Sequence, residues 1–355
     1  MPWDFKEEKK KQPSGLGQKK TETVVTNTDG SQYNMTSGEQ TRPPSTVLGQ
    51  SRGLAPRSHG WQEAPHLASG YLEAKVEGLQ SLLGGEGWPQ GAIIGVTGIG
   101  KTGKTTCCLQ EAMLQAAEGQ KVLYVYNESP RARFMKIANK HRDELGFSME
   151  QLANMSFYDL SGSTLQNPQP SGIERYAQGF ILKELLTQMK NQRPSLIVID
   201  SLTKLCRLYP AQAYYFIQQI TRGLWEGMDT LGLYPVVLCI MQKSGGHWEE
   251  TDATVLGGHG VGHELDGMIV FTREPVDTWK ARELGLDLGS TLRLIRIDSL
   301  RDVDTDDSAH LLIKQGGRLK IGPSPETMRL EKIAMDLIVE EAKKKAKAKT
   351  RKGKE

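Results

Sequence analysis

One short glycine-rich segment constrains this chain more than any other. The pattern GxxxxGK[ST] occurs as Gly98 to Thr105, after the apolar run Ala92 to Thr97 and before a stretch with helical spacing, Thr106 to Glu118. Glycines allow backbone N–H groups to curl around phosphate oxygens, and a helix that follows presents its positive N-terminus to the same anion. A strand, a phosphate loop and a helix in this order predict an α/β domain that binds ATP at the end of the strand.

The residues of this loop have separate expected roles. Lys104 is expected to reach the β- and γ-phosphates, and Thr105 is expected to bind Mg²⁺. A second register, Gly95 to Thr102 with Lys101 as its lysine, also fits the pattern, but it shortens the preceding strand and puts Gly103 into the first helical turn. We therefore favour the later register. The residues then expected to contact the nucleotide are Gly98, Ile99, Gly100, Lys101, Thr102, Gly103, Lys104, Thr105 and Thr106.

Polar residues follow three further apolar runs. The run Leu196–Ile199 ends in Asp200, which we expect to hold Mg²⁺ through water. Glu128 lies just beyond the strand Val122–Tyr126 and is our candidate for activating the attacking water. Gln242 ends another run and is expected to sense the γ-phosphate. The alternatives are a helix-capping aspartate, a surface glutamate and a polar strand end.

Composition divides the chain into four parts. Residues 1–65 are rich in Gly, Pro, Ser, Thr, Gln and Lys, cannot bury enough apolar surface to offset their ordering entropy, and are predicted to be disordered. Residues 70–322 alternate strands with helices, which predicts a mainly parallel sheet sandwiched by helices and extended by antiparallel strands after Leu265. Residues 323–342 are predicted to form a helix whose apolar stripe docks. Residues 343–355 are predicted to be a basic disordered tail.

Cysteine use and hydropathy suggest a compartment. The four cysteines form no CxxC pair, and three of them lie in apolar segments, as is typical of a reducing cytosol. No apolar run approaches the ~18 residues that span a bilayer. The start of the chain also lacks the apolar stretch of a signal peptide. We therefore expect a cytoplasmic protein with no membrane partner.

The order of these motifs resembles the RecA superfamily, particularly its RadA and KaiC branch. The resemblance extends from Val76 to Ile321 and includes Leu82–Gly85, the phosphate loop, Asn127–Ser129 and Leu196–Ser201. It implies a RecA-like fold, ATP and Mg²⁺ as cofactors, and a homo-oligomeric ring or filament. In such assemblies a basic residue of the neighbouring subunit stabilises the charge on the transferred phosphate. Arg301 lies where KaiC-like chains carry such an arginine.

Several residues depart from that family pattern. Asn127 replaces the first member of the glutamate pair that is common in this branch. Asp298 and Ser299 stand where a lysine is expected. These departures indicate a divergent relative.

The loop after Gln242 is the expected DNA contact, because in RecA-like chains it faces the central axis. It contains Lys243, Trp248 and histidines, but also several acids that oppose phosphate contact. The tryptophan is suited to stack on a base, and the basic run Lys343–Lys354 adds salt-dependent attraction to phosphates. We expect an ATPase that acts on single-stranded DNA in recombination, repair or replication. The alternatives are a KaiC-like ATP-operated switch and a DnaB-like helicase motor.

Overall fold

The structure is a computed structural model that describes residues 24–26, 32–34, 70–160, 173–206, 213–242, 259–301 and 303–352. The chain forms two units, Met1–Gln62 and Glu63–Glu355. In the first unit β1 (Val24–Thr26) pairs antiparallel with β2 (Gln32–Asn34). No regular element was predicted within residues 1–65, which were expected to be disordered. β-Branched and aromatic residues favour strands, and Asp-Gly between the two runs is a turn signal.

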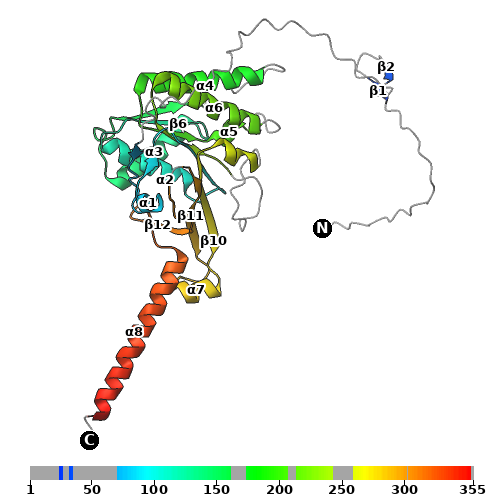
Figure 1. Cartoon of the computed structure of the whole chain (residues 1–355). Helices are drawn as coiled ribbons and strands as arrows, with labels where there is room; N and C mark the ends of the chain where they lie inside the picture. Colours follow the sequence, from blue (N-terminus) through cyan, green and yellow to red (C-terminus); the bar gives the residue numbers. More distant parts are fainter. Residues whose placement is uncertain are drawn as a thin grey trace, which may run out of the picture. The chain divides into compact units, whose positions relative to one another are not determined.

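The second unit is built on a nine-stranded mixed sheet in the order β13-β12-β11-β10-β5-β9-β8-β6-β7 (Figure 1). The strands from β10 to β7 in this order are parallel to one another, and β11, β12 and β13 continue the sheet antiparallel. The parallel strands are β5 (Ile93–Gly98), β6 (Val122–Tyr126), β7 (Met155–Asp159), β8 (Leu196–Asp200), β9 (Val236–Ile240) and β10 (Gly267–Pro275). The antiparallel strands are β11 (Thr291–Leu300), β12 (His310–Gln315) and β13 (Arg318–Ile321).

Helices cover both faces of this sheet, which confirms the predicted sandwich. Alternate residues of β6 enter opposite cores: Tyr124 packs in the cluster of α2 and α3, and Leu123 and Val125 pack in the cluster of α4 and α6. Parallel strands that are buried on both faces are expected to be apolar, as β6 and β9 are throughout and β8 is up to its final residue, Asp200. The helices are α1 (Leu79–Leu82), α2 (Lys104–Ala117), α3 (Arg131–Leu145), α4 (Ile173–Gln192), α5 (Leu202–Cys206), α6 (Ala213–Leu231), the 3-10 helix η3 (His259–Glu264) and α7 (Thr278–Leu284).

The segment before the phosphate loop is fixed to α2 by a buried carboxylate. Glu111 accepts hydrogen bonds from the backbone N–H of Val76 at 2.8 Å and from Trp88 Nε1 at 3.1 Å. Gln115 Nε2 donates a further bond at 2.8 Å. Burial raises the pKa of Glu111, and these donors oppose the rise. The short strands β3 (Tyr71–Leu72) and β4 (Trp88–Pro89) pair in this segment.

Two details differ from the sequence-based expectation. The run Met268–Thr272 was expected in the antiparallel extension, but β10 pairs parallel with β5 on one side and antiparallel with β11 on the other. The last helix, α8, runs without a break from Pro325 to Lys352, beyond its predicted end at residue 342. Lysine and alanine are good helix formers, which accounts for the extension. None of the helices in the described residues is long and apolar enough to cross a membrane.

Candidate active site

The sheet order brings the predicted site residues to one edge. The phosphate loop follows β5, and the next strands in the sheet are β9, β8 and β6. Gln242 lies beyond the end of β9, Asp200 ends β8, and Glu128 lies just beyond β6. In parallel sheets the carboxyl ends of the strands are where ligands bind. Four segments that are distant in sequence therefore meet at the edge where a nucleotide is expected.

The backbone of the loop has the form that a phosphate needs. Gly98 and Gly103 have φ angles of 143° and 114°, which side chains rarely allow, and a Cβ at Gly98 would clash with the Phe271 carbonyl oxygen. Gly103 is the N-cap of α2 and provides no side-chain cap, so the first N–H groups of the helix remain open to an anion. The helix begins at Lys104, two residues before its predicted start.

The two lysines of the loop have different environments. Lys104 is buried, and its Nζ donates to the carbonyl oxygens of Gly98 at 2.6 Å and Ile99 at 2.8 Å. Burial lowers the pKa of Lys104 to about 8, while the negative charges of Glu128 and Asp200 act in the opposite direction. Lys101 is exposed and has a φ angle of 66°. Of the two, only Lys104 is enclosed by the loop.

Asp200 is a buried carboxylate with one oxygen unengaged. Its Oδ2 accepts a hydrogen bond from the Tyr124 hydroxyl at 2.9 Å, and its Oδ1 is buried without a hydrogen-bond partner in the described part of the chain. Burial, followed by the charge of Glu128, raises the pKa of Asp200 to about 6, and the hydroxyls of Tyr124 and Thr105 and the charge of Lys104 oppose the rise.

These two oxygen donors suit Mg²⁺. A hydroxyl at Thr105 and an unengaged carboxylate oxygen at Asp200 are hard ligands. Mg²⁺ usually takes one or two carboxylates and completes its shell with waters and substrate phosphates. Within the described ranges, His, Cys, Asp and Glu side chains form no group of three or more that could hold a metal ion.

Glu128 is exposed and lies beside the other predicted residues. Ser201 Oγ donates to Glu128 Oε1 at 2.7 Å, and Gln242 Nε2 lies 3.4 Å from the same oxygen. Lys204 Nζ donates to the Glu128 backbone carbonyl oxygen at 2.9 Å. The carboxylate is therefore oriented by Ser201 and lies at the sheet edge, close enough to raise the pKa of Asp200.

Sequence reasoning missed the residues that hold this edge together. Asn127 is buried, accepts from the Ser201 backbone N–H at 2.8 Å and donates to the Ser201 carbonyl oxygen at 3.1 Å. Thr203 Oγ1 accepts from the Gln242 backbone N–H at 2.7 Å. Tyr124 orients Asp200 from the middle of β6. Only Asn127 gave a sequence signal, as a polar residue between an apolar strand and Glu128.

Arg301 does not join these residues in its own chain. Gly267 pairs with Leu300 on one side and with Ile94 on the other, so Arg301 lies level with the start of β5. The phosphate loop begins at Gly98, roughly 16 Å farther along the strand. Its guanidinium is 3.4 Å from Asp266 Oδ1 and 3.4 Å from the His263 carbonyl oxygen. The side chain is 58% exposed.

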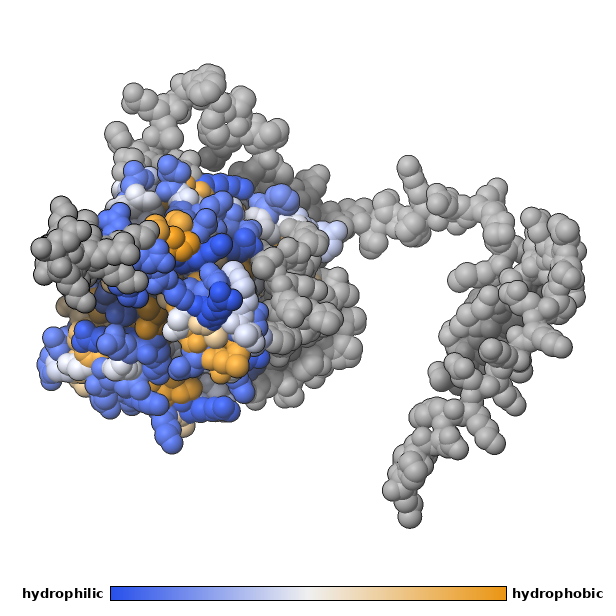
Figure 2. All heavy atoms as spheres, turned by 90° about the horizontal axis from the view of Figure 1, so that it is seen from below, coloured by the Kyte–Doolittle hydropathy of each residue, from blue (hydrophilic) through white to orange (hydrophobic). Residues whose placement is uncertain are grey.

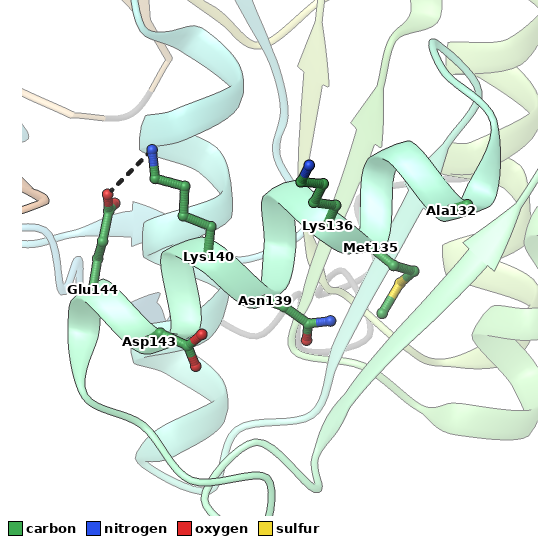
Figure 3. Close-up of a pocket in the computed structure, with 7 residues that line it drawn as sticks. All are labelled: Ala132, Met135, Lys136, Asn139, Lys140, Asp143 and Glu144. Atoms are coloured by element: carbon green, nitrogen blue, oxygen red, sulfur yellow. Dashed lines mark ion pairs between the residues drawn. The ribbon is translucent and has the colours of Figure 1, made fainter.

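Two other regions lie outside the site. The expected DNA loop, including Lys243 and Trp248, falls mostly among residues 243–258, outside the described residues. A depression of about 760 Å³ follows the exposed side of α3, where all seven lining residues come from that one helix (Figure 3). Lys140 and Glu144 form an ion pair there at 3.7 Å.

Comparison with known proteins gives one family and one fold. A family model described as "ATPase: KaiC" matches residues 72–326. The chain is similar in structure to a KaiC-like protein, PH0186, from the hyperthermophilic archaeon Pyrococcus horikoshii OT3, with a TM-score of 0.53 and 15% identity over 71% of this chain and 99% of that one. No curated protein matches the sequence. The matched family spans the phosphate loop and all four strand ends, and this chain therefore belongs to the KaiC family of ATPases within the RecA superfamily.

Proposed function

We propose that this chain hydrolyses ATP with Mg²⁺, as part of a homo-oligomer, and that the hydrolysis is coupled to binding of single-stranded DNA. The observation that carries the ATPase part is the meeting of Lys104, Asp200 and Glu128 at the ends of neighbouring parallel strands. The enclosed position of Lys104, in contrast to that of Lys101, favours the later register of the loop.

Each of these groups has a separate part in the reaction. The open N–H groups of α2 and the ammonium of Lys104 hold the β- and γ-phosphates. Thr105 and Asp200 hold Mg²⁺, which neutralises charge on the phosphates when it is bound. Glu128 takes the proton of the attacking water, with its carboxylate oriented by Ser201. Gln242 contacts the same carboxylate and is placed to report on the γ-phosphate.

The position of Arg301 supports a site that is shared between subunits. The residue is largely exposed and far from its own phosphate loop, which argues against a part in hydrolysis within one chain. In an oligomer it is available to the nucleotide of a neighbour. Arg301→Ala protein mixed with Glu128→Gln protein should regain part of the lost activity, since each variant supplies the group that the other lacks. Absence of rescue at high protein concentration would count against a shared site.

Support for the DNA part comes from charge. Residues 343–352 contain seven lysines and arginines and no acid, and Lys243 and Trp248 belong to the loop after Gln242. Basic segments of this kind bind phosphates in a salt-dependent way.

The test of the whole proposal is the rate of ATP hydrolysis with and without single-stranded DNA. We expect DNA to raise the rate, and the increase to disappear at a few hundred millimolar salt. Glu128→Gln should bind ATP and hydrolyse it very slowly under both conditions. A rate that DNA leaves unchanged would contradict the coupling and favour an ATP-operated switch.

A further inference from the structure

Helix α8 leaves the body of the molecule after a short anchored start (Figure 1). In its first turns Arg329 lies 3.8 Å from Glu283, and Lys332 donates to the Arg282 carbonyl oxygen, so the helix is held against α7. Met328 packs against a small apolar cluster at the same place. The sequence predicted that the apolar stripe of α8 would dock, without indicating its partner, and beyond its first turns the helix extends away from the domain (Figure 1).

Six large apolar side chains of α8 are exposed within ten residues. Each is between 45% and 65% exposed: Leu330, Ile333, Met335, Leu337, Ile338 and Val339. They make up half of the large hydrophobic side chains that are exposed in the described part of the chain. Figure 2 shows a mostly hydrophilic surface on the face seen from below, interrupted by separate apolar patches. An apolar set this dense on a projecting helix marks an interaction surface.

The charges of α8 are divided along its length. Between residues 325 and 342 the helix contains five acids and two basic residues. Between residues 343 and 352 it contains seven basic residues and no acid. The helix therefore has an acidic half that contains the exposed apolar residues, and a strongly basic half that follows it. A second copy of the same helix, turned end to end, matches this distribution.

We propose that α8 pairs in antiparallel orientation with α8 of a second copy of this chain. Leu330, Ile333 and Leu337 lie on one face of the helix. If Ile333 faces the partner's Leu337, Lys343 lies beside the partner's first turn, which contains Glu326. A parallel pair would instead place the two basic ends side by side, where like charges repel. Packing of the apolar segments supplies the attraction, and the charges set the orientation.

This contact is separate from the shared ATP site proposed above and does not rest on it. The pairing uses residues of α8, whereas the shared site uses the strand ends and Arg301. A chain in which Arg301 is changed to alanine should therefore still form the α8 pair. The overlapping apolar segment of ten residues covers about 15 Å of helix, so we expect an association of modest strength, seen at micromolar protein.

The test is sedimentation of the full chain without nucleotide, over a hundredfold range of concentration. The wild type should form dimers, and Leu337→Asp should weaken the dimer at least tenfold. Leu288→Asp is the matched control, because Leu288 is 66% exposed and lies outside α8. It should sediment as the wild type does. Circular dichroism should show the same helix content in all three proteins.

A charge exchange tests the orientation. Glu326→Lys alone should weaken the dimer, and adding Lys343→Glu in the same chain should restore it to within about threefold of the wild type. The two positions are seventeen residues apart in one helix, so only a partner can join them.

Three outcomes would overturn the pairing. They are a wild type that stays monomeric throughout, a Leu288→Asp effect equal to that of Leu337→Asp, and a double variant no stronger than Glu326→Lys alone. Binding of a monomeric chain to vesicles rich in anionic lipid, with dependence on Leu337, would overturn it in favour of a lipid surface.

Discussion

Replacing Asp200 by asparagine should make the nucleotide-free protein more stable while it abolishes Mg²⁺-dependent turnover. Asp200 is 3% exposed, and burial together with the charge of Glu128 raises the pKa of its carboxyl group from 3.8 to about 6. At neutral pH, folding in the absence of a ligand therefore buries the negative charge of Asp200 at the edge of the sheet, which is unfavourable. Asparagine is nearly isosteric and still accepts the Tyr124 hydrogen bond, but it carries no charge.

The size and sign of the effect follow from the pKa shift. A rise of about 2 units corresponds to about 3 kcal/mol at pH 7, which sets the upper limit of the gain. The folded pKa of Asp200 is the higher one, so the folded state binds more protons and the wild type loses stability as pH rises from about 4 to about 6. The advantage of Asp200→Asn should be full above pH 6, roughly half at pH 5, and absent near pH 4. An unsatisfied amide N–H in place of Oδ1 reduces the gain, and we expect about 1–3 kcal/mol.

Urea unfolding at pH 8, 5 and 4 measures this directly. Asp143→Asn is the matched control, since Asp143 is an exposed carboxylate on α3 with 67% side-chain exposure. It should change the free energy of unfolding by less than about 0.5 kcal/mol. A less stable Asp200→Asn protein at pH 8, or a gain that does not vary with pH, would refute the reasoning that the buried charge opposes folding.

Two further predictions concern the neighbours of Asp200. Because burial lowers the pKa of Lys104 to about 8, ATP binding above pH 8 must include uptake of a proton, and affinity at pH 9 should be about tenfold weaker than at pH 7. Titration calorimetry at the two pH values measures both affinities, and equal affinities would contradict the prediction. The ATP affinity of Lys104→Arg should not change between pH 7 and pH 9. Tyr124→Phe removes the 2.9 Å hydrogen bond that orients Asp200, and should raise the Mg²⁺ concentration needed for tight ATP binding by roughly tenfold. In EDTA, which removes Mg²⁺, Tyr124→Phe and the wild type should bind ATP with the same affinity. An equal loss of affinity in EDTA would show that the substitution damages the nucleotide site itself and not only the Mg²⁺ contact.

The sheet and the site edge were predictable because the signals are local. The runs that became β6, β8 and β9 are apolar over their whole length, and each is followed by a polar residue. Once the strands are parallel, Glu128, Asp200 and Gln242 must gather at one edge. The prediction needed no distances, only the order of apolar and polar residues.

The supporting residues were not predictable for a physical reason. Tyr124 lies in an apolar strand and has the pattern of a core aromatic, and only the fold shows its hydroxyl beside Asp200. The direction of β10 depends on its partner β5, which is far away in sequence. The exposed apolar stripe of α8 has the periodicity of a docked helix, and periodicity does not say whether the partner is the same chain.

The central claim is that the triphosphate lies in the loop between Gly98 and Thr105 with Lys104 as its lysine. The most direct measurement compares binding of a fluorescent ATP analogue, with Mg²⁺, by Lys104→Ala and Lys101→Ala. Lys104 is enclosed, with Nζ 2.6 Å from the Gly98 carbonyl oxygen, whereas Lys101 is exposed. We predict at least a hundredfold loss of affinity for Lys104→Ala and a change of less than about fivefold for Lys101→Ala. Near-normal binding by Lys104→Ala, with the loss found in Lys101→Ala, would contradict the account.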